Sequence, residues 1–120
     1  MAKVTLTKKA SPSFSSTVTV NGVPLPSFTD RLAYRNDLLL PLEATDRLGH
    51  YDLVASVHGG GSTGQVGAVR LGLSRCLEKA EPGLRPVLKG GGMLTRDSRV
   101  VERKKYGRHK ARKSKQWVKR

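Results

Sequence analysis

The sequence predicts a small body that contains both strands and helices, followed by an extended basic tail, and three observations lead to this prediction. Two segments near the amino end alternate β-branched residues, as strands do. A later stretch spaces its apolar residues at helical intervals. The last nineteen residues include ten Lys or Arg and little apolar surface. At 120 residues the chain has the length of one domain, which we divide into a body (1–101) and a tail (102–120).

The first elements expected are two short strands, at residues 4–6 and 17–20, where β-branched and apolar side chains recur. Residues 8–16 are rich in Ser and Pro, which predicts a loop between the strands. Asn21-Gly22 is a turn signal. The prolines of residues 23–26 argue against a paired central strand, so a reversal into a different element is expected there.

Two short helices are expected next. Residues 27–35 fit a helix with Ser27 as its N-cap and Asp30 as the capping partner three residues later. Pro41 suits the first position of a second helix, which would cover residues 41–48 and end at the following glycine.

A buried strand, a glycine loop and a long helix follow in that order. Residues 51–58 predict the strand and residues 59–64 the loop, after which the helix begins at Gly64 and ends before Pro82. The apolar side of this helix has Val66, Val69, Leu73, Cys76 or Leu77, and Ala80. Its polar side has Arg70, Ser74, Arg75 and Glu78.

Two short elements complete the body. Residues 84–88 predict one more helical turn, and residues 98–101 predict a sheet strand. Beyond Arg103 no apolar period remains, so the core is expected to end there.

The positive charge of the chain is concentrated at its carboxyl end. The net charge is +14, of which residues 85–120 contribute +12 and residues 1–84 only +2. This asymmetry predicts an anionic partner for the basic end, either nucleic acid or an anionic membrane. A membrane is disfavoured because the tail has no apolar face and no lipidation motif. Alone in water the tail should be disordered, whereas phosphates would order it by releasing counterions.

The glycine loop fits a phosphate-binding loop only in part. Residues 59–64 match the template as far as its second glycine, but Gln65-Val66 stand where Lys and Ser or Thr are needed. The free amides of a helix beginning at Gly64 still favour a phosphate, beside a purely conformational use of the glycines. The alternative function is therefore a small phosphate- or nucleotide-binding protein that uses residues 59–64, with a phosphate-binding enzyme as its runner-up form.

The remaining polar residues form no catalytic or metal-binding set. His50, His58 and His109 are scattered without metal-ligand spacing. Cys76 lies on the apolar side of its helix, where core packing explains it better than nucleophilic chemistry. A single cysteine also excludes an internal disulfide and suits a reducing compartment. We expect no enzyme activity, no cofactor and no metal.

Aromatic side chains interleave the charges of the tail. Tyr106, His109 and Trp117 are suited to stack on unpaired bases, and Gly107 permits a sharp bend. The basic residues begin on the body, at Arg96 and not after a flexible linker, which favours a specific RNA contact. The other interpretation is the non-specific arm of a free protein that condenses DNA or RNA.

A family resemblance is evident in residues 94–120, which read LTRDSRVVERKKYGRHKARKSKQWVKR. This stretch resembles the ninth protein of the small ribosomal subunit in its bacterial and organellar form. The matching features are TRD followed by ERKK, the glycine at 107, KARK at 110–113 and the final KR. A second block agrees, with HGGG at 58–61 followed by Ser62, Gly64-Gln65, Gly67-Ala68 and Arg70.

The resemblance implies the fold and the function. The fold would be the α+β domain shared with the second domain of ribosomal protein five, a mainly antiparallel sheet packed against two helices with a left-handed crossover. The function would be structural, binding small-subunit rRNA in the head and sending the tail toward the peptidyl-site tRNA during translation. The partners would be that rRNA, that tRNA and neighbouring head proteins, with no membrane.

The resemblance also implies which residues meet RNA. Those expected at the rRNA are Gly60, Gly61, Ser62, Gly64, Gln65, Arg70, Arg96, Arg99, Arg103, Lys104, Lys105, Arg108, Lys110, Arg112 and Lys113. Those expected at the tRNA are Lys119 and Arg120.

The chain departs from the family pattern at both ends. Residues 4–14 replace the usual Gly-Arg-Arg-Lys and Ala-Arg-Val, so the first strand loses expected RNA contacts and that edge of the sheet is expected to be shorter. Trp117-Val118 replaces the usual aromatic and serine before the final pair. Both departures resemble mitochondrial members, so a mitochondrial ribosome is expected, with a plastid or bacterial one as the alternative.

Overall fold

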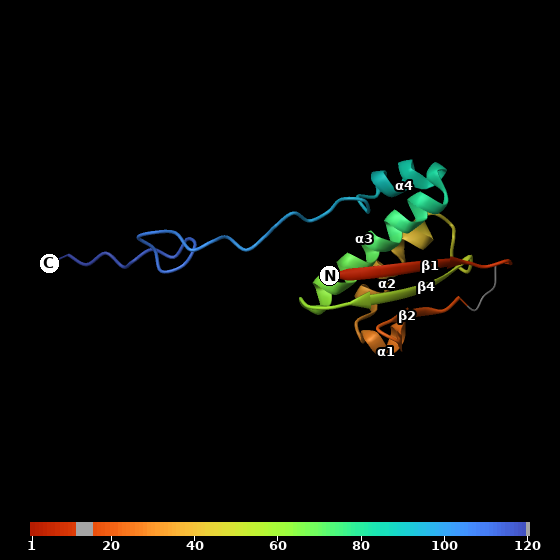
Figure 1. Cartoon of the computed structure of the whole chain (residues 1–120), viewed down its shortest axis with the longest axis horizontal. Helices are drawn as coiled ribbons and strands as arrows, with labels where there is room; N and C mark the ends of the chain where they lie inside the picture. Colours follow the sequence, from red (N-terminus) through yellow and green to blue (C-terminus); the bar gives the residue numbers. More distant parts are fainter. Residues whose placement is uncertain (12–15, 120) are drawn as a thin grey trace.

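The computed structural model describes residues 1–11 and 16–119, which form a folded body with a long tail extending from it (Figure 1). The molecule measures 77 × 32 × 21 Å along its principal axes because the tail runs away from the body. Its elements in chain order are β1 (Ala2–Lys8), β2 (Val18–Val20), β3 (Val23–Pro24), α1 (Leu25–Phe28), α2 (Leu32–Ala44), β4 (Tyr51–Val57), α3 (Ser62–Ala80), the 3₁₀ turn η1 (Pro82–Leu84) and α4 (Arg85–Gly90).

Strand β4 lies inside a four-stranded mixed sheet with the order β1-β4-β2-β3. It is antiparallel to β1, from Ala2 opposite Val57 to Lys8 opposite Tyr51, and parallel to β2. Strand β1 pairs with β4 along all 7 of its residues, and the expected shortening of this edge relative to the family stays a prediction. The loop predicted at 8–16 begins after Lys8, and its residues 12–15 lie outside the described part of the chain.

The predicted turn at Asn21-Gly22 is a two-residue hairpin between β2 and β3. Asn21 has a φ of 54° and Gly22 a φ of 76°, the left-handed values that such hairpins require. The Asn21 side chain also bonds to β4, since its Oδ1 accepts from Val57 N at 2.8 Å. Residues 23–24 pair only as an edge strand, where Pro24 is tolerated, so the expectation that they form no central strand is confirmed. The expected change to a different element follows at Leu25, where α1 begins.

The core lies between the sheet and the helices α2 and α3 (Figure 1). Side chains of β4 alternate, so that Tyr51, Leu53, Ala55 and Val57 are buried against the helices while Val54 is 53% exposed on the other face. The remaining buried apolar residues are Val20, Leu25, Leu38, Leu42, Val66, Val69, Leu73, Leu77, Leu88 and Met93. The predicted strand at 51–58 is therefore confirmed.

The two helices predicted at 27–35 and 41–48 are divided differently in the structure. A single turn, α1, ends at Phe28, and α2 then runs from Leu32 through Pro41, so Ser27 caps no helix. A proline inside a helix loses one hydrogen bond and costs about 3 kcal/mol. Here Leu38, Pro41 and Leu42 are all buried, and burial of that apolar face outweighs the loss.

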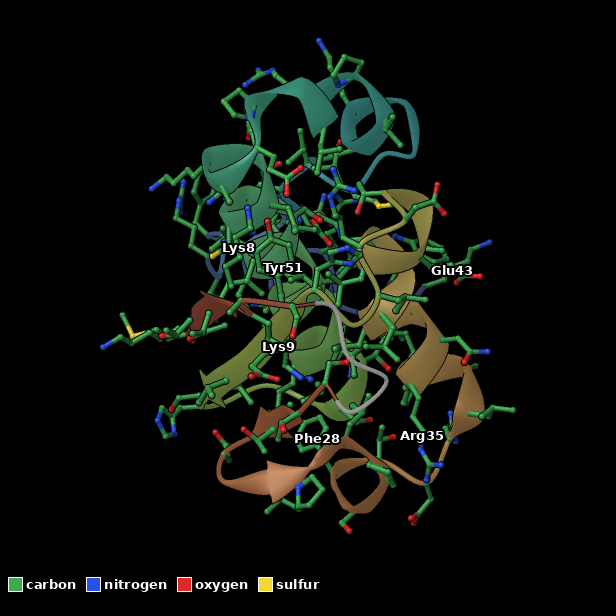
Figure 2. The ribbon with its side chains drawn as sticks, turned by 90° about the vertical axis from the view of Figure 1, so that its right-hand side faces the viewer. Lys8, Lys9, Phe28, Arg35, Glu43 and Tyr51 are labelled. Atoms are coloured by element: carbon green, nitrogen blue, oxygen red, sulfur yellow. The ribbon has the colours of Figure 1, made fainter. Side chains whose placement is uncertain are left out.

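Helix α2 is held at both ends by polar contacts. At its start the guanidinium of Arg35 donates to the carbonyls of Thr29 at 2.7 Å and Pro26 at 2.9 Å, which ties α1 to α2 (Figure 2). At its end Thr45 Oγ1 donates to Pro41 O at 2.8 Å. Asp46 then takes a φ of 53°, so the helix ends before the predicted glycine.

Helix α3 confirms the predicted long helix and its inward face. Four of the predicted apolar positions are buried: Val66, Val69, Leu73 and Leu77. Leu77, rather than Cys76, occupies the core position, and Ala80 is exposed. Ser74, predicted on the polar side, is fully buried because its Oγ donates to Arg70 O at 2.9 Å and so needs no water.

Helix α4 confirms the predicted helical turn at 84–88. The body ends soon after this helix. Leu94 is the last residue that packs against the core. The strand predicted at 98–101 is wrong, since Val100 is 82% and Val101 96% exposed and neither pairs with the sheet. Adjacent valines point to opposite sides of an extended chain, so they offer no common face to bury. The division at residues 101 and 102 stays a prediction.

Candidate nucleic-acid interface

A groove of about 700 Å³ lies beside the amino-terminal half of α3. Its other walls are the start of β1 and the segment that leaves the core toward the tail. It is lined by Met1, Ala2, Thr63, Gly64, Gly67, Ala68, Arg70, Leu71, Gly72, Arg75, Met93, Thr95, Arg96, Asp97 and Arg99. The groove therefore joins three parts of the chain that are far apart in sequence.

The charge of the groove is strongly positive. Its basic residues are Arg70, Arg75, Arg96 and Arg99, and its one carboxylate is Asp97. Arg70 Nη1 bonds Asp37 Oδ1 at 2.6 Å, and Arg99 Nη2 bonds Asp97 Oδ2 at 2.8 Å. The bonds from Arg99 lower the pKa of Asp97 to about 2. Arg75 and Arg96 are exposed and make no ion pair within residues 1–11 and 16–119, so their charges are available to an external anion.

Small residues line the helical wall of the groove, and they differ in what they do for the fold. A Cβ at Gly72 would lie 2.6 Å from Val4 Cγ2, so this glycine lets β1 pack closely on α3. A Cβ at Gly64 or Gly67 would meet no described atom within 4 Å. Because glycine inside a helix costs about 0.5–1 kcal/mol relative to alanine, packing within the chain gives no reason for Gly67.

The glycine loop precedes α3 and is exposed. Gly59 and Gly60 have φ values of 77° and 75°, and Gln65 Nε2 donates to Gly59 O at 3.3 Å. The helix begins at Ser62 with Gly61 as its N-cap, two residues earlier than predicted. Of the loop residues predicted at the rRNA, Gly64 lines the groove, whereas Gly60, Gly61 and Ser62 do not.

A hydroxyl contact fixes this end of α3 to α2. Tyr34 Oη lies 2.7 Å from Thr63 Oγ1, and Arg31 Nη1 donates to Tyr34 Oη at 3.2 Å. The pKa of Tyr34 is lowered, first of all by its hydrogen bond with Thr63. Together with the Asp37–Arg70 pair, this contact holds the groove wall against α2.

The tail extends away from the body, and its predicted residues lie outside the groove lining (Figure 1). All are exposed: Arg103, Lys104, Lys105, Arg108, Lys110, Arg112 and Lys113. Tyr106 and Trp117 are 95% and 80% exposed. Lys119 is exposed near the tip, and Arg120 lies outside the described residues. The predicted RNA-binding residues therefore lie partly at the groove and partly along the tail, whereas Gly60, Gly61, Ser62 and Gln65 lie at the start of α3 outside the groove lining.

Metal-binding groups and membrane-spanning helices were also sought in the described part of the chain. Residues 1–11 and 16–119 contain no group of three or more His, Cys, Asp and Glu that would hold a metal ion. None of the helices described is long and apolar enough to cross a membrane. Cys76 is partly buried, with its Sγ 3.8 Å from Val4 O.

Arg75, Gly67 and Thr63 belong to the groove but were not predicted to meet RNA. Helical spacing gives a signal for two of them, because residues 64, 67, 68, 71 and 75 fall on one side of an α-helix. The sequence pattern placed Arg75 on the polar side of the helix, yet gave no reason to prefer it to Glu78. Its place in the groove is visible only in the structure, where Thr95, Arg96 and Arg99 line the same groove.

A comparison with protein families bears on the groove and the tail together. The family model described as ribosomal protein S9/S16 matches residues 1–120, which include both. Members of this family are not enzymes, so the alternative of a phosphate-binding enzyme at residues 59–64 is wrong. The chain belongs to the ribosomal protein S9/S16 family, and it is a structural protein of the small ribosomal subunit.

Proposed function

We propose that the groove and the tail are two successive contacts with the rRNA of the small-subunit head. The observation that carries this proposal is the continuity of charge between them. Arg96 and Arg99 line the groove and belong to the same segment that continues into Arg103 and the rest of the tail. An RNA strand leaving the groove would therefore meet further cations along its path.

Phosphate contact explains the composition of the groove better than base recognition does. Guanidinium groups bind phosphate oxygens in a bidentate manner. Gly64 and Gly67 leave room for a sugar-phosphate backbone to lie directly on the helix, close to the free amides at its amino end. We therefore assign Gly64, Arg70, Arg75, Arg96 and Arg99 to backbone positioning.

The salt dependence of rRNA binding tests the proposal. The full-length chain is titrated against purified small-subunit rRNA in filter-binding assays between 50 and 200 mM KCl. Neutralising six or more phosphates predicts a loss of affinity of about a thousandfold over this range. An affinity that changes less than about threefold would contradict the proposal, because phosphate neutralisation always releases counterions.

We further propose that the tip of the tail reaches the peptidyl-site tRNA. Lys119 and Arg120 supply the charges and Trp117, 80% exposed, supplies a surface on which a base can stack. The length of the tail supports this reach, since the molecule extends over 77 Å. Figure 1 shows the tip at the end farthest from the body.

Two finer assignments are also proposals. The first is a mitochondrial ribosome, with a plastid or bacterial ribosome as the alternative; the Trp117-Val118 ending and the divergent residues 4–14 support it. The second is the fold of the second domain of ribosomal protein five with its left-handed crossover. In that fold, the left-handed crossover would be the connection that runs through α2 between the parallel strands β2 and β4. Fluorescent tagging and organelle fractionation test the first assignment.

A further inference from the structure

The tail contains a closed loop that its composition does not predict. Arg112 donates twice to Glu102, from Nε to Oε2 at 3.2 Å and from Nη2 to Oε1 at 2.7 Å. Lys105 Nζ lies 3.6 Å from the same carboxylate. Glu102 is the one acidic residue among residues 102–120, and the ion pairs within the described residues 102–119 converge on it.

Further contacts close the loop on its carboxyl side. Arg108 and Ser114 form an antiparallel bridge, and His109 N donates to Lys113 O at 2.9 Å. Arg108 Nη1 donates to Arg112 O and to Ser114 Oγ, both at 2.8 Å. Gly107, with a φ of 69°, makes the turn into the bridge. Residues 102–114 were expected to be disordered in the free protein. In the structure one carboxylate and one bridge hold them in a loop.

We propose that Glu102 is a positioning residue that closes residues 102–114 into a loop before RNA is bound. The inference rests on the proposed rRNA contact of the tail and deepens it. Glu102 raises the affinity for RNA, although it is a negative charge within a basic arm. It does so because a loop that is already closed loses less conformational freedom on binding.

Loss of the Glu102 charge would have two effects of opposite sign on RNA affinity. Removing a negative charge from a basic arm strengthens binding to a polyanion if only net charge matters. Removing the clamp weakens binding if the loop must be closed to fit. The bond from Arg112 lowers the pKa of Glu102, so the carboxylate is ionised at neutral pH and holds its partner there.

The variant Glu102→Gln, in the full-length chain, separates the two effects. Heteronuclear ¹⁵N NOE values of residues 106–114 are measured in the free protein, and the affinity for small-subunit rRNA is measured at one fixed KCl concentration. We expect lower NOE values and about threefold weaker binding than in the wild type. Unchanged NOE values, or binding as tight as or tighter than the wild type, would overturn the proposal.

Glu43→Gln is the matched control, because it makes the same change of charge and side chain elsewhere. Glu43 is exposed on α2, points away from the body (Figure 2), and makes no ion pair within the described residues. This control is expected to bind rRNA at least as tightly as the wild type. A loss equal to that of Glu102→Gln would mean that the effect is general, and would overturn the role of the loop.

Exchange of the two partners tests the pair itself. The variant Arg112→Glu is expected to open the loop, and the double variant Glu102→Arg with Arg112→Glu is expected to restore the NOE values of the wild type. Failure of the exchange to recover the NOE values would overturn the clamp. Absence of salt-dependent binding by the wild type would instead overturn the proposed function, while the NOE comparison still decides whether Glu102 closes the loop.

Discussion

Arg47 and Glu81 join the carboxyl ends of α2 and α3, the two helices that cover the sheet. Arg47 follows α2, and its Nη2 lies 2.7 Å from Oε2 of Glu81, the residue at the carboxyl end of α3. Tyr51 of β4 donates its hydroxyl to Glu81 Oε1 at 2.7 Å. One carboxylate thus holds α2, α3 and β4 together at the end of the body opposite the groove wall at Thr63.

Glu81 is expected to make the stability of the fold depend on pH in the acid range. Hydrogen bonds from Arg47, and next from Tyr51, lower the pKa of Glu81 from 4.5 to about 2. A carboxyl whose folded pKa is lowered stabilises the fold above its unfolded pKa, and this stabilisation is lost as pH falls between 4.5 and 2. Urea midpoints of the wild type should fall more steeply across this window than those of Glu81→Gln. Parallel curves for the two proteins would contradict the assignment.

Gly72→Ala is expected to destabilise the body. The added methyl group would lie 2.6 Å from Val4 Cγ2 and 3.2 Å from Val4 Cβ, and a β-branched side chain cannot easily rotate away. We expect a net loss of about 1–2 kcal/mol in the free energy of unfolding, after the gain in helix propensity is subtracted. Thermal unfolding measures it, and a higher melting temperature would show that β1 shifts without strain.

Gly67→Ala is expected to do the opposite in the free protein and to damage binding. The new methyl group meets no described atom within 4 Å, so the helix should gain about 0.5–1 kcal/mol. On rRNA the same methyl group would occupy the space assigned to the backbone, and affinity should fall about tenfold. A variant that is more stable and binds normally would remove Gly67 from the interface.

Arg75→Ala and Arg96→Ala are expected to weaken rRNA binding in a salt-dependent manner. Each removes an exposed guanidinium that makes no ion pair within the described part of the chain. The slope of log affinity against log salt should decrease by about one for each substitution. Arg85→Ala is a suitable control, because Arg85 pairs with Glu78 and does not line the groove. An equal change of slope in Arg85→Ala would show that net charge alone matters.

Deletion of Lys119 and Arg120 is expected to separate assembly from tRNA binding. Subunits that contain the truncated chain should assemble normally, because the groove and the loop at 102–114 are intact. Their affinity for peptidyl-site tRNA should fall about threefold to tenfold, as expected for the loss of two phosphate contacts. Equal tRNA affinity of wild-type and truncated subunits would contradict the role of the tip.

Periodic segments of the sequence predicted their elements well, and positions decided by tertiary contacts were predicted poorly. Strand β4 and helix α3 follow from alternation and helical spacing, which are local properties. Pro41 was expected to begin a helix because proline favours the first helical position. In the structure, burial of Pro41 beside Leu38 and Leu42 stabilises a helix that continues through it. Ser74 was assigned to the surface because its bond to Arg70 O is invisible in a sequence.

The candidate interface shows the same limit. Arg70, Arg96 and Arg99 were predicted one by one, from the resemblance, but nothing in the sequence shows that they line one groove. That arrangement depends on β1 packing against α3 at Gly72 and on residues 95–99 running beside both. The loop at 102–114 was missed because the composition shows ten cations in the tail but does not show that Glu102 bonds Arg112.

The position of β4 also sets the order in which a nascent chain can fold. Strand β1 has no partner until residues 51–57 are synthesised, and β2 has only the two residues of β3. Unpaired strand edges are prone to wrong pairing, so β1 and β2 are open to mispairing until β4 is made. The basic tail follows last, when every strand and helix of the body has already been made.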